Sequence, residues 1–355
     1  MPSIREVAKT AGVSIATVSR VMNGTDTVAI DLREKVLKAV DACDYSPKVG
    51  RRSLDSIALI YVGPFTVGSP YDSACLEGMV DGMRASNLDL TIVDLSRDRG
   101  SGETLRQFFA RKGIRGGVLR CTAAERRLAV DMAAEGLPLV VLGDHFDCDQ
   151  LSFAYAGSKS ASRDAVEHLV SLGHKRVAFA ACERDDGDHV DRLVAYREVL
   201  REHGLLDESL VCRVPPHRFD GAQLLRNLLG MPHRPTALFV ADPLVAVGAM
   251  NEAHRMGVRV PEDLSIVGFD DNDLRHTVYP RMSAVCQDAK LVGKAAWELV
   301  LRRCDERPGD AVTRLPPQEA WLEVCNSTGP APTNPDRVLP TGARLSGARR
   351  PRGSM

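Results

Sequence analysis

The sequence predicts an α/β protein with a small N-terminal domain of three helices and a larger two-lobed core of doubly wound parallel sheets. Two observations support this fold class. Apolar residues recur at helical spacing in the first 43 residues, and short β-rich runs alternate with helical segments from Ile57 onward. The 355 residues suffice for two or three domains with sizeable cores. We expect the helical domain over 1–46, a hinge over 47–56, the core over 57–326, and a disordered tail over 327–355, rich in Pro, Gly and Arg.

The first two helices are short and are separated by a tight turn. Ser3 and Glu6 have the S-x-x-E spacing of a capping box, which places the start of the first helix at Ser3. Gly12 permits the positive φ at which that helix stops, and Ser14 can cap a second helix over 15–22. This arrangement is typical of the helix-turn-helix, whose second helix enters the DNA major groove, although any small helical hairpin has the same shape.

A third helix is expected over 31–43. Asp31 and Glu34 repeat the capping spacing. The apolar residues from position 32 to Val40 form one face of the helix. Pro47 follows soon after, and proline disfavours helical conformation in the residue before it. This helix completes a small core under the first two.

The segment 4–24, IREVAKTAGVSIATVSRVMNG, closely resembles the N-terminal signature of the LacI/GalR family of bacterial transcription repressors. It also stands at the N-terminus, where that family carries it, and the resemblance extends over about residues 1–326. The resemblance implies that the second helix binds operator DNA. The positions that we expect to contact DNA are Ser14, Ile15, Ala16, Thr17, Ser19, Arg20 and Asn23.

The chemistry of these positions divides them into two groups. Arg20 can offer a bidentate fork to guanine O6 and N7, whereas Ile15 and Ala16 suit thymine methyl groups or close approach. By resemblance to the family, these three positions carry most of the operator discrimination. Thr17 and Ser19, near the start of the helix, are better placed for phosphate.

Residues 48–54, KVGRRSL, occupy the place of the family's hinge, which becomes helical on operator DNA and wedges a leucine into a central base step. Arg52 and Leu54 match the hinge pattern, and apolar wedges do unstack and kink duplex DNA. Lys48 stands where Asn is usual and Arg51 where Ala is usual, and the linker to the first strand is shorter than usual. A basic linker that contacts phosphates without specificity is therefore the alternative.

The core contains two series of alternating strands and helices. The expected strands lie at 57–62, 90–95, 116–120 and 138–143 in the first series, and at 153–157, 176–181, 210–214, 236–241 and 264–269 in the second. Residues 283–325 add a strand, a helix over 288–304 and closing strands, enough chain to cross back between lobes. Two facing lobes of this periplasmic-binding-protein-like kind place a ligand site in the cleft, because binding occurs at strand carboxyl ends.

Polar residues follow several of these strands. By residue-by-residue resemblance, the effector pocket is lined by Tyr71, Asp72, Arg192, Asp242, Asp270 and Gln287. Carboxylates and a guanidinium can each hold two neighbouring hydroxyls, and an aromatic face can cover the apolar side of a sugar ring, so the set suits a polyol. Structural alternatives are that Asp242 caps the helix opened by Pro243, and that Asp270 orders a loop.

Charge and cysteine content narrow the function classes. The net charge of −1 combines +3 in residues 1–54 and +4 in 327–355 with −8 between them, which fits a protein that places one end on phosphates. Nine cysteines are scattered singly without a C-x-x-C pair, which favours reduced thiols over disulfides or zinc. His145 and Cys148 form a weak metal-like pair without a second pair, so we expect no metal and no cofactor.

Enzyme and membrane classes find little support. The chain has no G-x-S-x-G elbow, no phosphate-cradling glycine loop and no H-E-x-x-H motif, so we expect no enzymatic activity. No apolar run approaches the length of a membrane span and no signal-peptide pattern precedes Ser3, which favours a cytoplasmic location. The lack of a signal-peptide pattern and the presence of the helix-turn-helix both argue against a solute-binding module of the periplasmic type.

Together these observations predict a sequence-specific DNA-binding transcriptional regulator of the repressor type. A small effector, a sugar or sugar derivative, would bind between the lobes. A homodimer is expected on palindromic double-stranded operator DNA, because one helix-turn-helix contacts only a half-site. The alternatives are a regulator that needs no effector and one that is controlled by a nucleobase.

Overall fold

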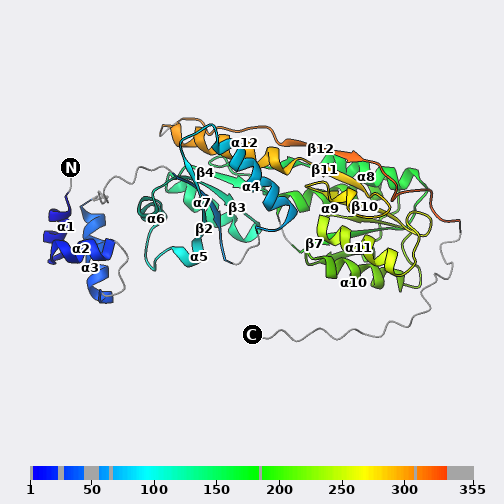
Figure 1. The fold of residues 1–355 in the computed structure, drawn as a ribbon, viewed down its shortest axis with the longest axis horizontal. Helices are drawn as coiled ribbons and strands as arrows, with labels where there is room; N and C mark the ends of the chain where they lie inside the picture. The colour runs from blue at the N-terminus through cyan, green and yellow to red at the C-terminus, as the bar shows by residue number, and fades with distance from the viewer. Residues whose placement is uncertain are drawn as a thin grey trace.

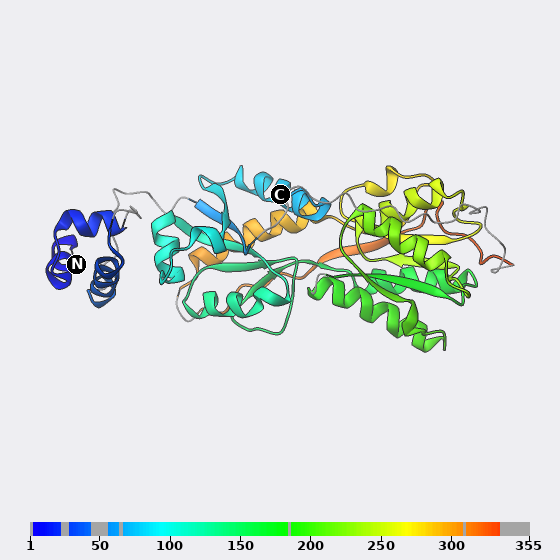
Figure 2. The ribbon, with the colours of Figure 1, turned by 90° about the horizontal axis from the view of Figure 1, so that it is seen from below.

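The N-terminal domain is a bundle of three helices, separate from the two lobes in Figure 2. The computed structural model describes residues 3–22, 28–43, 56–63, 67–183, 186–307 and 310–333. The helices are α1 (Ile4–Ala11), α2 (Ile15–Met22) and α3 (Ile30–Ala42). The capping box is confirmed, since the Ser3 side chain accepts from the Glu6 amide at 3.4 Å and Glu6 Oε2 accepts from the Ser3 amide at 2.9 Å. Gly12 ends α1 at φ 65°. The bundle is held by a buried apolar core of Val7, Ala8, Val18, Val21, Val36, Ala39 and Val40.

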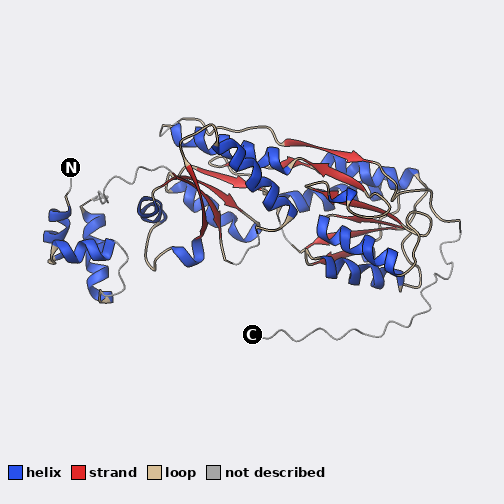
Figure 3. Ribbon diagram, viewed as in Figure 1, coloured by secondary structure: helices blue, strands red, loops and turns tan. Residues whose placement is uncertain are grey.

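The first lobe is a five-stranded parallel sheet covered by helices on both faces (Figure 3). Its strands, in the spatial order β2-β1-β3-β4-β5, are β1 (Ser56–Tyr61), β2 (Asp89–Asp94), β3 (Ile114–Arg120), β4 (Leu139–Leu142) and β5 (Ser152–Ala154). Its helices are α4 (Pro70–Met83), α5 (Leu95–Asp98), α6 (Leu105–Lys112), α7 (Arg126–Ala134) and, from later in the chain, α12 (Ala289–Asp305), with a 3₁₀ turn η1 (Ala123–Glu125).

The second lobe contains a seven-stranded sheet in the order β6-β12-β11-β10-β9-β7-β8. Its strands are β6 (Ala156–Gly157), β7 (Val177–Cys182), β8 (Val211–Val214), β9 (Ala237–Val240), β10 (Ser265–Asp270), β11 (Ser283–Gln287) and β12 (Gln318–Glu323). Its helices are α8 (Lys159–Ser171), α9 (Gly187–Glu202), α10 (Arg218–Leu229) and α11 (Pro243–Arg255), with 3₁₀ turns η2 (Glu208–Leu210) and η3 (Leu274–His276). The sheet departs from parallel pairing where β12, one of the expected closing strands, returns from the first lobe and pairs antiparallel with β11.

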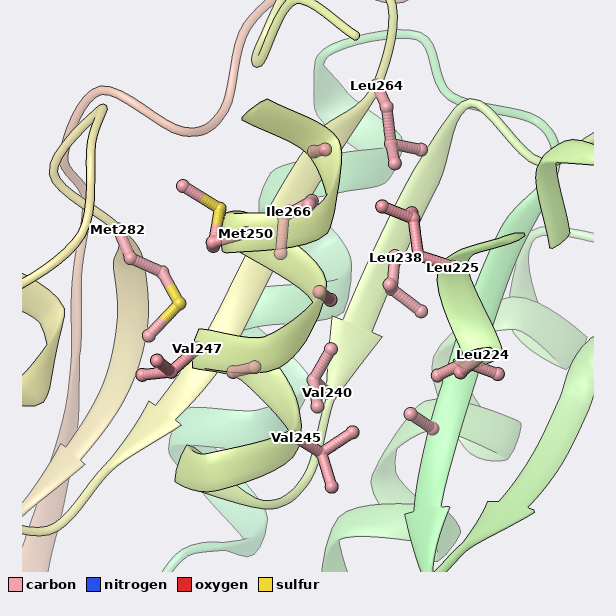
Figure 4. Packing of buried hydrophobic residues seen from close by; sticks show 14 of the residues in the cluster. Leu224, Leu225, Leu238, Val240, Val245, Val247, Met250, Leu264, Ile266 and Met282 are labelled. Atoms are coloured by element: carbon pink, nitrogen blue, oxygen red, sulfur yellow. The ribbon is translucent and has the colours of Figure 1, made fainter. Parts of the chain in front are cut away.

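Close packing of apolar side chains joins the sheet of the second lobe to its helices (Figure 4). Leu238 and Val240 on β9 and Ile266 on β10 face Val245 and Met250 on α11. All five are at most 1% exposed. Because parallel strands covered on both faces are buried on both sides, the strands have the continuous apolar sequences that predicted them.

The chain passes between the lobes three times, after β5, after β11 and after α12. The helix α12 therefore packs on α4 of the first lobe, as Figure 1 shows, while the strands before and after it belong to the second lobe. Glycines allow the two helices to approach closely: a Cβ at Gly78 would lie 1.9 Å from the Lys290 carbonyl oxygen, and one at Gly293 would lie 1.9 Å from that of Cys75.

The prediction of a disordered tail is wrong for residues 327–331, because these residues pack on the second lobe. The Ser327 hydroxyl donates to the Ile266 carbonyl at 2.5 Å and accepts from the Ser283 amide at 2.8 Å. The Ala331 amide donates to the Leu172 carbonyl at 2.9 Å. Residues 334–355 lie outside the described residues. None of the helices in the described part of the chain combines the length and apolar character that a membrane span needs.

Replacement of Gly293 tests the contact between α4 and α12. Alanine in a helix normally stabilises it by roughly 1 kcal/mol relative to glycine, but overpacking of a filled site costs roughly 1–3 kcal/mol. Because the added methyl would meet backbone, we expect Gly293→Ala to lower the free energy of unfolding, measured by urea denaturation. The exposed Gly100, whose Cβ would make only ordinary contacts of 3.6–3.7 Å, is the control. An equally stable Gly293→Ala protein would contradict the proposed close contact.

Candidate functional site

The outer face of α2 carries the side chains that the sequence assigned to DNA. Ser14, Ala16 and Arg20 are exposed, and Ile15 is 46% exposed although it is large and apolar. Val18 and Val21 on the opposite face are buried in the bundle. Because the apolar side chains point into the bundle, the exposed side chains on the other face of α2 are accessible to a groove of DNA.

The start of α2 is capped as predicted. The Ser14 hydroxyl accepts from the Thr17 amide at 3.1 Å and lies 2.9 Å from the Thr17 hydroxyl. Thr17 and Ser19 are half-buried. Asn23, Arg52 and Leu54 were also predicted to contact DNA, and all three lie outside the described residues, as does most of the hinge.

A cavity of about 290 Å³ opens between the two lobes. The first lobe contributes the start of α4 and the carboxyl ends of β3 and β4, and the second lobe contributes the carboxyl ends of its parallel strands. Its lining includes Ser69, Tyr71, Arg120, Gly143, Asp186, Asp188, His189, Arg192, His217, Asp242, Asp271 and Gln287. The cavity therefore lies where the strand-end argument placed it.

Four of the six residues predicted to bind the effector line this cavity: Tyr71, Arg192, Asp242 and Gln287. Arg192 donates from Nη1 to the Ala241 carbonyl at 2.7 Å, with its guanidinium carbon 3.5 Å from the centre of the Phe269 ring. This packing holds the guanidinium in one place at the second-lobe wall.

The other two predicted residues lie beside the cavity and hold its walls. Asp72 accepts from Arg120 Nε at 2.8 Å, in a pair whose side chains are 3% and 9% exposed. Asp270 accepts from the Leu274 amide at 2.9 Å and from Arg275 Nη1 at 2.7 Å, so it orders the loop after β10. The lining position after β10 belongs to the next residue, Asp271.

Sequence reasoning missed several lining residues: Arg120, Asp186, Asp188, His189 and Asp271. The signal that could have found them is the strand-end rule itself, since Arg120 ends β3 and the D-G-D-H segment 186–189 follows β7. The first of these carboxylates also caps α9, because Asp186 Oδ1 accepts from the His189 amide at 2.9 Å.

Several buried polar atoms at the cavity have no hydrogen-bond partner. Asp188 Oδ1 and Gln287 Oε1 accept no hydrogen bond, and their residues are 3% and 4% exposed. The Tyr71 hydroxyl is also buried without a nitrogen or oxygen partner, and beside it lies the Cys75 thiol, which forms only weak hydrogen bonds. An unsatisfied buried group of this kind costs about 1–3 kcal/mol, so groups that converge on one cavity mark it as a candidate binding site.

Burial also shifts the pKa values of the lining carboxyls. Burial and the nearby Asp186 raise the pKa of Asp188 to about 7, and burial raises the pKa of Asp271 to about 6. Burial opposes the charged form of His189, but the Asp186 carboxylate, 2.7 Å from Nδ1, outweighs it and raises the pKa of His189 to about 10. Ionisable groups perturbed in this way are typical of binding and catalytic sites.

Direct contacts join the lobes next to the cavity. Asp144, after β4 of the first lobe, accepts from the Gly187 amide of α9 at 2.6 Å and from Arg126. His145 Nε2 lies 3.1 Å from Asp191 Oδ2 on α9. These contacts span the cleft, so a ligand that changes the separation of the lobes must affect them.

The fold and site define a class: a helix-turn-helix domain joined to a two-lobed ligand-binding core. Residues 3–48 match the family model described as bacterial regulatory proteins, lacI family, and residues 166–321 match a periplasmic binding protein-like domain. The HTH-type transcriptional regulator AscG of Escherichia coli (strain K12) is 30% identical over 295 residues, covering 80% of this chain and 87% of AscG. The chain belongs to the lacI family of bacterial regulatory proteins, and its relatives are transcriptional regulators.

Further relatives and solved structures agree. The ribose operon repressor of Haemophilus influenzae is 28% identical and covers 85% of this chain and 92% of its own. The structure of a transcriptional regulator CelR–cellobiose complex is 28% identical, with a TM-score of 0.68, and covers 92% of this chain and 100% of its own. The lac repressor dimer bound to operator and the anti-inducer ONPF is 23% identical with a TM-score of 0.66, covers 92% of this chain and 99% of its own, and shares the fold.

Replacement of Asp271 tests the cost of its buried charge. A carboxyl whose pKa is raised from 3.8 to about 6 on folding destabilises the folded state increasingly between these two pH values, so this cost is small near pH 4 and fully present above pH 6. Asparagine keeps an acceptor for Gln287 Nε2, which now donates to Asp271 Oδ1. We expect Asp271→Asn to raise the free energy of unfolding by roughly 2–3 kcal/mol at pH 7.5, at about 1.4 kcal/mol per pKa unit, with little effect at pH 4.

Urea denaturation at both pH values measures this difference. The control is Asp149→Asn, because the Asp149 side chain is 96% exposed and its pair with Arg314 lies at the surface. A destabilised Asp271→Asn protein at pH 7.5, or an equal gain at pH 4, would show that the charge carries no such cost.

Proposed function

We propose that this protein is a transcriptional repressor that binds palindromic operator DNA as a homodimer and responds to a sugar or sugar derivative bound between its lobes. The observation that carries the effector part is a set of buried polar atoms around the cavity that have no nitrogen or oxygen partner at hydrogen-bond distance, on Tyr71, Asp188 and Gln287. Asp188 Oδ1 has only a long contact of 3.8 Å with His145 Nε2. The DNA-binding part is supported by the exposed face of α2 and by the relatives named above.

The chemistry of the cavity favours a polyol over a nucleobase. Four carboxylates and a glutamine oxygen offer many acceptors, and each carboxylate can hold two neighbouring hydroxyl groups. Tyr71 is the single Phe, Tyr or Trp side chain in the described lining, so one large aromatic face is available to cover a sugar ring. At about 290 Å³ it lies at the small end of ligand pockets, which suits a compound of monosaccharide size.

Control of DNA binding would pass through the contacts between the lobes. An effector held by Tyr71 of the first lobe and Arg192 of the second favours one separation of the lobes. It shifts the equilibrium only if it binds that arrangement better than the alternative. The Asp144–Gly187 and His145–Asp191 contacts are the ones that such a shift would make or break.

Replacement of Arg20 tests the DNA-binding proposal. We expect Arg20→Ala to lose roughly 1–3 kcal/mol of affinity for the preferred operator and to relax sequence choice at one base pair per half-site. Binding-site selection followed by titration at fixed salt measures both effects. Lys35→Ala, an exposed lysine on α3, is the control and should leave the selected sequence unchanged. Identical selected sequences for Arg20→Ala and the parent would refute the assignment.

A thermal-shift screen with monosaccharides, sugar phosphates, sugar acids and purines tests the effector proposal. A compound at a hundred times its Kd stabilises the protein by roughly 2.7 kcal/mol, which raises the Tm by a few degrees. We expect a hit among the sugars, and we expect Tyr71→Phe to bind it less tightly without loss of stability, since the lost hydroxyl has no strong partner.

The matched control is Tyr279→Phe, because Tyr279 is 83% exposed and lies away from the cavity lining. A purine hit would favour the nucleobase alternative. A protein that binds operator DNA but gives no shift with any compound would favour a regulator that needs no effector.

A further inference from the structure

Three potential metal ligands gather at the second-lobe wall of the cleft. Cys182 is the last residue of β7, Asp242 follows β9, and His189 lies in the first turn of α9. The strands β7 and β9 are neighbours, with Ala180 aligned to Val240, so their carboxyl ends lie side by side. One ligand atom from each of the three residues lies within 4.8 Å of the others, and no other such group of three occurs among the described residues.

The spacing and chemistry of this group suit zinc. Bonds of about 2.3 Å to sulfur and about 2.0–2.2 Å to nitrogen or oxygen place tetrahedral ligand atoms roughly 3.3–3.8 Å apart, which small side-chain rotations achieve here. One thiolate, one imidazole and one carboxylate leave a fourth position for water or another oxygen ligand. Because His189 and Asp242 line the cavity, this fourth position faces it.

The surroundings of His189 match those of a metal-binding histidine. Its Nδ1 lies 2.7 Å from Asp186 Oδ1, a buried carboxylate, which leaves Nε2 for a metal. Metal-bound histidines commonly donate their second ring N–H to a carboxylate in this way, because the donation fixes the ring and raises the basicity of the ligand nitrogen. The Cys182 Sγ atom lies within 4.8 Å of a ring nitrogen of His189, so thiol and imidazole are close neighbours.

The third ligand, Asp242, also caps a helix. Asp242 Oδ1 caps α11 by accepting from the Leu244 and Val245 amides at 2.9 and 3.0 Å. Its second oxygen is not used by the cap and is available to a cation. The cap holds the carboxylate rigidly beside β7, so little order is lost when a metal binds.

A second observation points to a cationic ligand. The cavity is lined by Asp186, Asp188, Asp242 and Asp271 against the guanidinium groups of Arg120 and Arg192 and the imidazole of His189. Arg120 is already paired with Asp72, and His189 with Asp186. Asp188 Oδ1 is buried in this cavity without a hydrogen-bond partner. A divalent cation within reach of these carboxylates compensates charge that the protein leaves unbalanced.

We infer that Cys182, His189 and Asp242 bind a divalent transition-metal ion, best matched by Zn²⁺, whose open coordination position faces the cavity between the lobes. Asp186 positions His189 for this role. The inference concerns the second lobe alone and does not depend on the identity of an organic effector or on DNA binding.

Isothermal titration of metal-stripped, reduced full-length protein with ZnCl₂ tests the site. We expect one Zn²⁺ per chain. Cys182→Ser and Asp242→Asn should each weaken binding by more than the roughly 10- to 100-fold that is typical of the loss of an outer-shell partner, and Asp186→Asn should fall within that range. Asparagine caps helices as well as aspartate does, so Asp242→Asn keeps the start of α11 intact.

The control is Cys148→Ser, which removes a half-buried thiol from a separate His–Cys pair and should leave the affinity unchanged. Titration with Co²⁺ adds a spectroscopic signature, because a thiolate ligand gives an intense charge-transfer band that Cys182→Ser should abolish. The site would be overturned if the parent protein bound no Zn²⁺, or if Cys182→Ser and Asp242→Asn bound Zn²⁺ as tightly as the parent does. Either result leaves the proposed DNA-binding function standing, because the titration contains neither DNA nor effector.

Discussion

Four carboxylates converge on the cavity between the lobes, and two guanidinium groups stand against them. The convergence follows from the fold, since Asp186, Asp242 and Asp271 follow β7, β9 and β10 and parallel strands end at the same edge of the sheet. Burial makes the charge unfavourable, and it raises the pKa values of Asp188 and Asp271 to about 7 and 6. Well-packed apolar residues would be more stable here. The proposed ligands, a polyol or a metal ion, would compensate this charge.

The same cavity is where the lobes are joined, which makes its occupancy relevant to the rest of the molecule. Asp144 and His145 of the first lobe contact Gly187 and Asp191 at the start of α9, the helix that also supplies Asp188 and His189 to the cavity. The helix α12 is packed tightly onto the first lobe, because glycines at 78 and 293 bring it into backbone contact with α4. Only a short set of polar contacts joins the lobes at the cavity, an arrangement compatible with hinge or shear motion.

The sequence predicted the fold class and most of the strands, because buried parallel strands leave strong local patterns. It placed residues 153–157 in one strand of the second lobe, whereas β5 and β6 belong to different sheets. The site was predicted less completely. Tyr71, Arg192, Asp242 and Gln287 line the cavity, whereas Asp270 does not. Successive side chains of a strand alternate between faces, and β10 extends through Asp270, so the lining residue is Asp271. A one-residue uncertainty in where the strand ends therefore decides which carboxylate reaches the ligand. The packing of Ser327 was missed because its hydrogen bonds to β10 and β11 are long-range and have no local sequence pattern.

Structural and functional interpretations of one residue need not compete, because different atoms of a side chain can serve different ends. Asp242 Oδ1 caps α11, which satisfies the structural interpretation, while its other oxygen remains toward the cavity. His189 behaves likewise, with Nδ1 held by Asp186 and Nε2 left over. Gln287 donates through Nε2 to Asp271 and leaves Oε1 without a partner. In each case a structural bond fixes one atom of the side chain and thereby orients another toward the cavity. Preorganisation of this kind lowers the entropy lost on binding, so Asp242 and Asp186, which cap helices, are also well placed to hold a ligand.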